Sequence, residues 1–123
     1  MTAQEVITQV QHKMPSLIKE NLMYRWLSEL DGRITLELIN PYGDAQKLPV
    51  YDENSSDANM LVPAPYDFLY IDYLEMQIAR ANGEQQRFSI AQGAFEEKYE
   101  AFRRWWMRTH PRQTPSVRFP TRR

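Results

Sequence analysis

The side chains that most often carry out acid–base or metal chemistry are scarce in this chain. Two histidines, His12 and His110, lie near opposite ends of its 123 residues, and there is no cysteine. A hydrolase or transferase needs a nucleophile and a base, or a metal ion, held close together. The four glycines are isolated, so neither a phosphate-binding loop nor a dinucleotide fingerprint is present. We therefore expect a protein that is not an enzyme and binds no nucleotide.

One acidic stretch has the oxygen-rich character of a calcium-binding loop, with Asp52, Asn54 and Asp57 as candidate ligands. In such a loop, glycine makes the tight turn at the sixth position and a glutamate binds the ion at the twelfth. Those positions hold Asp57 and Pro63 here. We interpret the stretch as a solvated acidic loop, and we expect no metal and no other cofactor.

Two adjacent tryptophans, Trp105 and Trp106, stand among Arg103, Arg104 and Arg108. Aromatic faces between cations are typical of surfaces that stack on the bases of single-stranded nucleic acid. Core packing beside a solvated basic face is the alternative, and we favour it. Neighbouring residues on a helix point about 100° apart, so the two rings cannot share one narrow core stripe. We predict that one ring contacts a partner subunit, with Arg103 and Arg104 at the same interface.

The formal net charge of −1 conceals an uneven distribution. Residues 103–123 contain seven arginines and no Asp or Glu, so this segment carries +7 and the remaining residues carry −8. An acidic body joined to a basic tail predicts that the tail contacts something acidic, either nucleic acid or a protein surface.

The end of the chain, residues 111–123, is interrupted by three prolines, which predicts an extended segment. Val117 and Phe119 alternate with polar residues, a pattern that suits a strand added to a sheet edge or a segment lying in a groove, with arginines paired to carboxylates. A solvated terminus without a function is the alternative. We interpret residues 111–123 as a docking arm. Its predicted contact residues are Arg112, Val117, Arg118, Phe119, Arg122 and Arg123.

Apolar residues recur at intervals of three and four over the first part of the chain, as in amphipathic helices. Thr2 and Glu5 have the spacing of a capping box, which predicts a first helix over about 3–13 that the next proline ends. The periodicity then predicts a second helix over about 16–39. Gly32 lies inside it at a cost of roughly 1 kcal/mol relative to alanine.

Two further helices are expected in the second half. Pro65 fits the first turn of a third helix that extends to Arg87 or slightly further. Residues 89–93 are a plausible break. An aromatic stripe beginning at Phe95 then predicts a closing helix that ends near His110.

The stretch between Asn40 and Pro65 contains four prolines, one glycine and several Asp, Asn and Ser residues, which predict turns. Within it, residues 47–51 are expected to form at most an edge strand or β-arm, because proline interrupts strand pairing. The chain length suits one domain. We therefore predict an all-α protein, a small four-helix bundle with a long irregular loop between helices two and three and an extended C-terminal tail. The helical domain comprises residues 1–110 and the docking arm residues 111–123.

No stretch reaches the roughly 18 consecutive apolar residues of a membrane span, and the beginning of the chain lacks the pattern of a signal peptide. We expect synthesis in a cytoplasm and no contact with a membrane.

Five segments of the sequence are informative when they are considered together. They are Arg25-Trp26-Leu27-Ser28-Glu29-Leu30-Asp31-Gly32-Arg33-Ile34, Leu61-Val62-Pro63-Ala64-Pro65-Tyr66-Asp67, Tyr73-Leu74-Glu75, Ala81-Asn82-Gly83-Glu84 and Trp105 to His110. Together these segments resemble a family of siphophage head–tail connector proteins. The most characteristic piece is the Val-Pro-Ala-Pro-Tyr-Asp stretch that leads into the Tyr-Leu-Glu helix. The resemblance covers nearly the whole chain from Thr2 to His110.

The resemblance implies a structural protein of the phage neck that assembles with further copies, commonly as a dodecameric ring, beneath the portal at the capsid vertex. Such a ring extends the DNA channel toward the tail, and the family implies no catalytic residue. The implied partners are the portal protein, a downstream stopper or tail-completion protein, and genomic DNA that passes without sequence-specific binding. Family members generally engage the portal through their C-terminal part, which here is the docking arm.

Two expectations about assembly follow. Lateral, head-to-tail helix contacts that close on themselves would give a ring, and an acidic inner wall would repel the phosphates of passing DNA. The alternative function is a helical nucleic-acid-binding accessory protein that uses the basic C-terminus on phosphates.

Overall fold

Four helices of eleven or more residues dominate the computed structural model, which describes residues 1–42, 46–55 and 57–110. These four are α1 (Ala3–Lys13), α2 (Glu20–Ile34), α4 (Leu69–Ala81) and α5 (Gln85–Thr109), and a short helix, α3 (Asn40–Tyr42), lies between α2 and α4 in the chain. A π-helical turn (Thr35–Ile39) joins α2 to α3, and 3-10 turns occupy Glu53–Ser55 and Tyr66–Phe68. Apart from an isolated bridge between Thr2 and Asn59, the described residues contain no β-structure.

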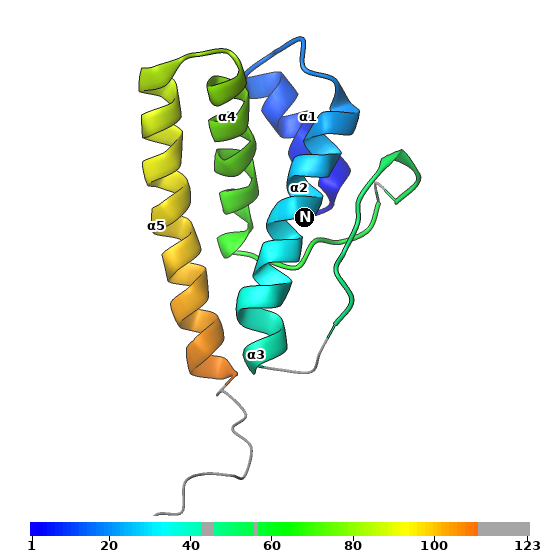
Figure 1. Ribbon diagram of the computed structural model, residues 1–123, viewed down its shortest axis with the longest axis vertical. Helices are drawn as coiled ribbons and strands as arrows, with labels where there is room; N and C mark the ends of the chain where they lie inside the picture. Colours follow the sequence, from blue (N-terminus) through cyan, green and yellow to red (C-terminus); the bar gives the residue numbers. More distant parts are fainter. Residues whose placement is uncertain (43–45, 56, 111–123) are drawn as a thin grey trace, which may run out of the picture.

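Helix α4 is the centre of the bundle (Figure 1). It forms an antiparallel hairpin with α5 and packs against α1 and α2 on its other side. Helix α5 has 25 residues, about 37 Å, so it runs past the beginning of α4 and reaches the π-helical turn. The predicted small all-α bundle of four helices is confirmed.

The core consists of the apolar stripes that the helices turn toward one another. Each fully buried large aliphatic or aromatic side chain contributes about 1.5–3 kcal/mol relative to exposure. The largest of these side chains are Tyr70, Phe102, Ile7, Met23, Leu27, Leu30, Ile34, Leu38, Leu69, Leu74, Ile78 and Val6.

Helix α1 begins as its sequence predicts. The backbone N–H of Thr2 donates to Glu5 Oε1 at 2.8 Å, and the backbone N–H of Glu5 donates to Thr2 Oγ1 at 3.1 Å. This reciprocal capping box satisfies two N–H groups that the first turn leaves without partners. The helix spans Ala3–Lys13, the predicted range.

The second helix begins later than the predicted residue 16. Ser16 Oγ accepts the backbone N–H of Ile18 at 3.3 Å, a local turn that competes with helix formation. The backbone of Lys19 is extended, and α2 begins at Glu20. At the other end, the helical path continues to Ile39 as predicted, but as a wider π turn. There Thr35 Oγ1 donates back to the carbonyl oxygen of Asp31 at 2.8 Å.

The predicted boundary between helices three and four is wrong. Helix α4 ends at Ala81, and residues 89–93 lie inside α5. Gly83 has a φ of 73°, in the left-handed region that favours glycine. The N–H of Glu84 donates to the carbonyl of Ala79 at 2.8 Å and that of Gly83 to Arg80 at 3.2 Å, the hydrogen-bond pattern of a Schellman cap. This cap ends α4 six residues before the predicted Arg87.

Two glycines in different backbone conformations should respond oppositely to alanine. Gly32 lies in the interior of α2, and a Cβ atom added there would meet nothing within 4 Å. We expect Gly32→Ala to raise the free energy of unfolding by about 0.5–1 kcal/mol. We expect Gly83→Ala to lower it by about 1 kcal/mol, because of its positive φ. Urea unfolding followed by circular dichroism measures both, and equal effects of the two variants would contradict this prediction.

The stretch before α4 is irregular in its described parts. Residues 47–51 pair with no strand among the described residues, so the edge strand that the sequence allowed is not formed there. Pro65 precedes the 3-10 turn Tyr66–Phe68, and α4 starts only at Leu69. Among the described helices, none is both long and apolar enough to cross a membrane.

Candidate interaction site

The end of α5 carries a cluster of aromatic rings that fastens this helix to the rest of the bundle. Phe102 is fully buried, and its ring centroid lies 6.1 Å from those of both Trp105 and Trp106. Trp105 lies against Tyr66, with ring centroids 5.5 Å apart. Trp106 Nε1 donates to the carbonyl oxygen of Leu38 at 3.2 Å. The cluster therefore joins α5 to the 3-10 turn before α4 and to the π-helical turn.

His110 closes this end of the helix. Its ring stacks on that of Trp106 with centroids 3.7 Å apart and planes inclined by 7°. The His110 backbone N–H donates to the carbonyl oxygen of Trp106 at 2.8 Å. Both the ring and the backbone of the last described residue therefore contact Trp106 of the same helix.

Both tryptophans are half-buried within the chain's own fold. The roughly 100° between them is accommodated because Trp105 turns to Tyr66 and Trp106 turns to Leu38 and His110. Contact of one ring with a partner subunit stays a prediction.

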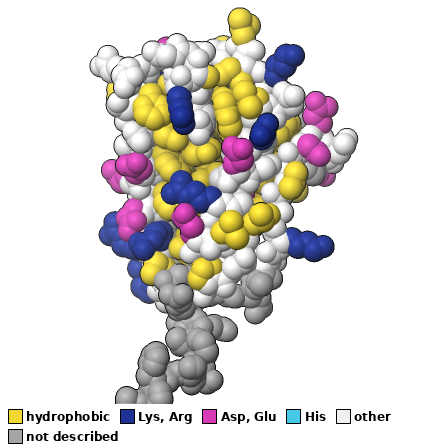
Figure 2. Space-filling model, in the orientation of Figure 1, with side chains coloured by type: hydrophobic (Ala, Val, Ile, Leu, Met, Phe, Trp, Pro, Cys, Tyr) yellow, Lys and Arg dark blue, Asp and Glu magenta, His cyan; other side chains and the backbone are white. Residues whose placement is uncertain are grey.

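The arginines beside these rings form a basic surface over the last turns of α5, where blue side chains gather in Figure 2. Arg103 and Arg104 each pair with Glu100: its Oε1 lies 3.0 Å from Arg103 Nη1 and 3.8 Å from Arg104 Nε. Arg108 is exposed one turn further along. The remaining predicted contact residues, in the docking arm at 111–123, lie outside the described residues.

The other candidates from the sequence do not converge. His12 is exposed on α1, whereas His110 ends α5. In the acidic stretch, Asp52 Oδ1 accepts the backbone N–H of Asn54 at 2.9 Å, which is a local turn. Across residues 1–42, 46–55 and 57–110, no three His, Asp or Glu side chains are grouped so that they could hold a metal ion.

The most unusual polar group in the described structure is Asp31, a fully buried carboxylate on α2. Its Oδ2 accepts the hydroxyl of Tyr51 at 2.5 Å and the backbone N–H of Leu61 at 3.2 Å. Its Oδ1 accepts the hydroxyl of Tyr70, on α4, at 2.6 Å. The Tyr70 hydroxyl in turn accepts the backbone N–H of Val62 at 2.9 Å. One carboxylate therefore joins α2, α4 and two points of the long loop.

Burial raises the pKa of Asp31, and the hydrogen bonds from Tyr51, Tyr70 and Leu61 oppose this rise only in part. Burial and the adjacent carboxylate likewise raise the pKa values of Tyr51 and Tyr70. Both hydroxyls therefore keep their protons at neutral pH and act as donors.

The raised pKa of Asp31 has a measurable consequence. A carboxyl group whose pKa is higher in the folded state binds its proton more tightly there, so it contributes stability below its unfolded pKa and loses it as pH rises through the folded value. Wild-type protein should therefore gain stability relative to Asp31→Asn as pH falls from 7 toward 4. Urea unfolding of both proteins across this range measures the difference. A difference that does not change with pH would contradict the prediction.

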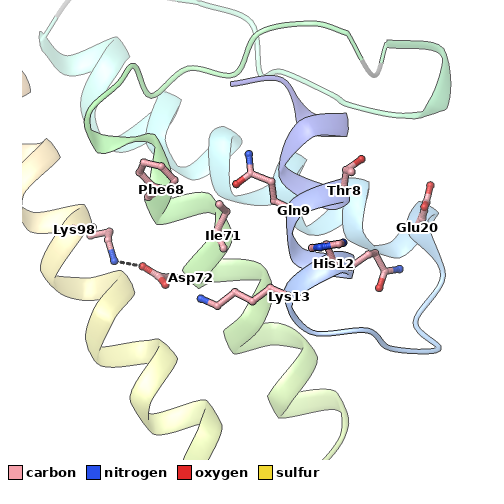
Figure 3. Close-up of a pocket in the computed structure, with 10 residues that line it drawn as sticks. Thr8, Gln9, His12, Lys13, Glu20, Phe68, Ile71, Asp72 and Lys98 are labelled. Atoms are coloured by element: carbon pink, nitrogen blue, oxygen red, sulfur yellow. Dashed lines mark hydrogen bonds and ion pairs between the residues drawn. The ribbon is translucent and has the colours of Figure 1, made fainter.

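A groove of 910 Å³ lies on another face, between α1 and α5 with α4 as its floor. Figure 3 shows Phe68, Ile71 and Asp72 between Lys98 on α5 and the α1 side chains. Lys98 pairs with Asp72, so one cation and one carboxylate of the groove neutralise each other. Phe68, which is 52% exposed, is the largest apolar side chain that the groove offers.

Comparisons of the chain with protein-family models, with curated proteins and with solved structures gave no match.

Sequence reasoning found the aromatic cluster but missed the Asp31 centre. Asp31 lies in an amphipathic run at a position that faces the core, between Leu27 and Ile34. A carboxylate on the buried stripe of a helix needs polar partners inside the protein, because an unpaired buried charge is strongly destabilising. This conflict between a charged side chain and a position that faces the core was the signal in the sequence. It does not reveal the partners Tyr51, Leu61 and Tyr70, which lie 20, 30 and 39 residues away.

Proposed function

We propose that this protein is a structural head–tail connector of a tailed bacteriophage, in the neck of the virion. In this proposal, copies of the bundle form a ring beneath the portal, the docking arm at 111–123 binds the portal, and a stopper or tail-completion protein binds below. Genomic DNA passes through the ring without sequence-specific contacts.

The observation that carries this proposal is the way the resembling segments meet in the fold. The backbone N–H of Leu61, in the Leu61–Asp67 stretch, binds Asp31, in the Arg25–Ile34 stretch. Tyr66 of the former stretch packs against Trp105 of the closing helix. Segments that are far apart in the chain therefore contact one another around α4. A common fold would require such contacts between the segments that together resemble one family.

The arrangement of charge also supports the proposal. The basic end of α5 leads directly into the docking arm, whereas the acidic groups lie in the body. A separate basic arm suits binding to an acidic partner surface while the body contacts neighbouring copies.

The test is binding to portal-bearing capsids that lack this protein. We expect the full chain to bind them and electron microscopy to show a ring below the portal. We expect a variant without residues 111–123, checked for helix content by circular dichroism, to lose this binding. Absence of binding by the full chain would refute the connector function. Unchanged binding by the shortened variant would refute only the role of the arm.

Nucleic-acid binding is the second candidate, and the basic surface on α5 favours it. Two of the arginines there already pair with Glu100, which reduces what they offer to phosphates. Tight, salt-sensitive binding of DNA by the monomer would support this function over the connector, because phosphate contacts release counterions. We expect only weak binding at physiological salt.

A further inference from the structure

The long loop presents an apolar segment that the bundle holds but does not cover. We call residues 46–50 the edge segment. Its side chains Leu48 and Val50 are 52% and 72% exposed. At one end the backbone N–H of Gln46 donates to Asn40 Oδ1 at 2.8 Å. At the other, the backbone N–H of Tyr51 donates to Ser28 Oγ at 2.7 Å. Figure 1 shows this segment rising beside α2 from the end that carries α3.

The backbone of the edge segment has groups available for pairing. Within the described part of the chain, the N–H groups of Leu48 and Val50 have no hydrogen-bond partner. Leu48 precedes proline, which favours an extended backbone. In an extended chain, alternate N–H groups point to the same side. The N–H of Tyr51 points to α2, Pro49 has none to offer there, and those of Leu48 and Val50 then point outward.

A surface of this kind is recognised by an extended segment that adds its own backbone beside it. The sequence of the chain itself contains a segment with a matching pattern of apolar residues. Val117 and Phe119 are separated by one residue, as Leu48 and Val50 are, so each pair occupies one face of a strand. Cross-strand pairs of apolar side chains contribute roughly 0.2–1 kcal/mol each. We propose that residues 116–119 bind along the edge segment of the same chain, with Val117 and Phe119 beside Leu48 and Val50.

Charge supports the same occupant. The exposed side chains of Asp52 and Glu53 follow the edge segment after Tyr51. Residues 111–123 contain Arg112, Arg118, Arg122 and Arg123 and no acidic residue. A bound arm therefore brings arginines to a carboxylate-bearing turn.

The end of α5, after which the arm follows in the sequence, lies near the start of the edge segment. The ring of Trp106 is hydrogen-bonded to Leu38, and the side chain of Asn40, two residues further, holds Gln46. The end of α5 and the start of the edge segment thus share one end of the molecule (Figure 1). The seven residues from His110 to Val117 can span about 23 Å when extended, so binding within one chain is within reach.

This inference goes beyond the proposed connector function and does not depend on it. It describes a free subunit whose arm occupies its own loop, so an external partner for the arm has to displace that contact.

The test uses the absence of native cysteine. In the full chain at micromolar concentration, we expect Val50→Cys with Phe119→Cys to form an intramolecular disulfide under mild oxidation. Its rate should exceed that of Leu36→Cys with Phe119→Cys by about tenfold or more, because docking raises the effective concentration of the two thiols. Leu36 is the matched control because it is 59% exposed and lies in the π-helical turn, at the same end of the molecule as the end of α5. Equal rates for the two pairs, or a disulfide that forms only between molecules, would overturn the proposal.

A second measurement needs no disulfide. We expect the full-chain variant Val117→Ser/Phe119→Ser to increase amide hydrogen exchange at Leu48 and Val50 by about tenfold, while exchange at Leu74 in the core of α4 is unchanged. Identical exchange at Leu48 and Val50 in the variant and the wild type would count against the docked arm. Circular dichroism confirms that the bundle is intact in each variant.

Discussion

We expect the replacement of Asp31 with alanine to lower the free energy of unfolding by about 3–5 kcal/mol. The substitution removes the carboxylate that accepts three hydrogen bonds, two from the buried hydroxyls of Tyr51 and Tyr70 and one from the half-buried backbone N–H of Leu61. Each buried donor left without a partner costs about 1–3 kcal/mol. Urea unfolding at neutral pH measures the loss.

Asp31→Asn is the control for this prediction. It keeps the shape of the side chain and one acceptor oxygen, so we expect a loss of about 1–2 kcal/mol. A loss below about 1 kcal/mol for Asp31→Ala would mean that the loop and α4 do not depend on this carboxylate.

Replacing Phe102 with alanine should be about as damaging, with an expected loss of about 3–5 kcal/mol. Phe102 is fully buried beneath Tyr66, Trp105 and Trp106, so its removal leaves a cavity under the whole aromatic cluster. Thermal or urea unfolding measures the loss, and tryptophan fluorescence should shift to the red as water reaches the indole rings.

Ile90→Ala on the same helix is the matched control. Ile90 is largely exposed, so the change should alter stability by no more than about 0.5 kcal/mol. Equal losses for Phe102→Ala and Ile90→Ala would show that the aromatic cluster does not hold α5 to the bundle.

Sequence periodicity predicted the helices best where the signals are local. The capping box at Thr2 and Glu5 depends on residues three apart, and it places the start of α1 correctly. The boundary between α4 and α5 also had a local signal, the Asn82-Gly83 pair, because glycine after a helix favours a left-handed cap. The prediction instead placed the break at residues 89–93, which lie inside α5.

The polar centre could not be predicted in the same way. Tyr51, Leu61 and Tyr70 have no sequence spacing that relates them to Asp31, because they approach it from a loop and a different helix. Similarly, the pattern indicated that Trp105 and Trp106 must face different directions. It could not indicate that Trp105 contacts Tyr66 and that Trp106 contacts Leu38. Such contacts arise from packing between elements, which a single chain's periodicity does not encode.

The Asp31 centre has a consequence for how the molecule opens. Long surface loops usually fluctuate independently of the elements that they connect. Here the loop contributes Tyr51 and Leu61 to the same buried carboxylate that α4 engages through Tyr70. If residues 51 and 61 moved away from Asp31, its buried carboxylate would lose two of its hydrogen-bond donors. We therefore expect these parts of the loop to open together with the helices, as one cooperative unit.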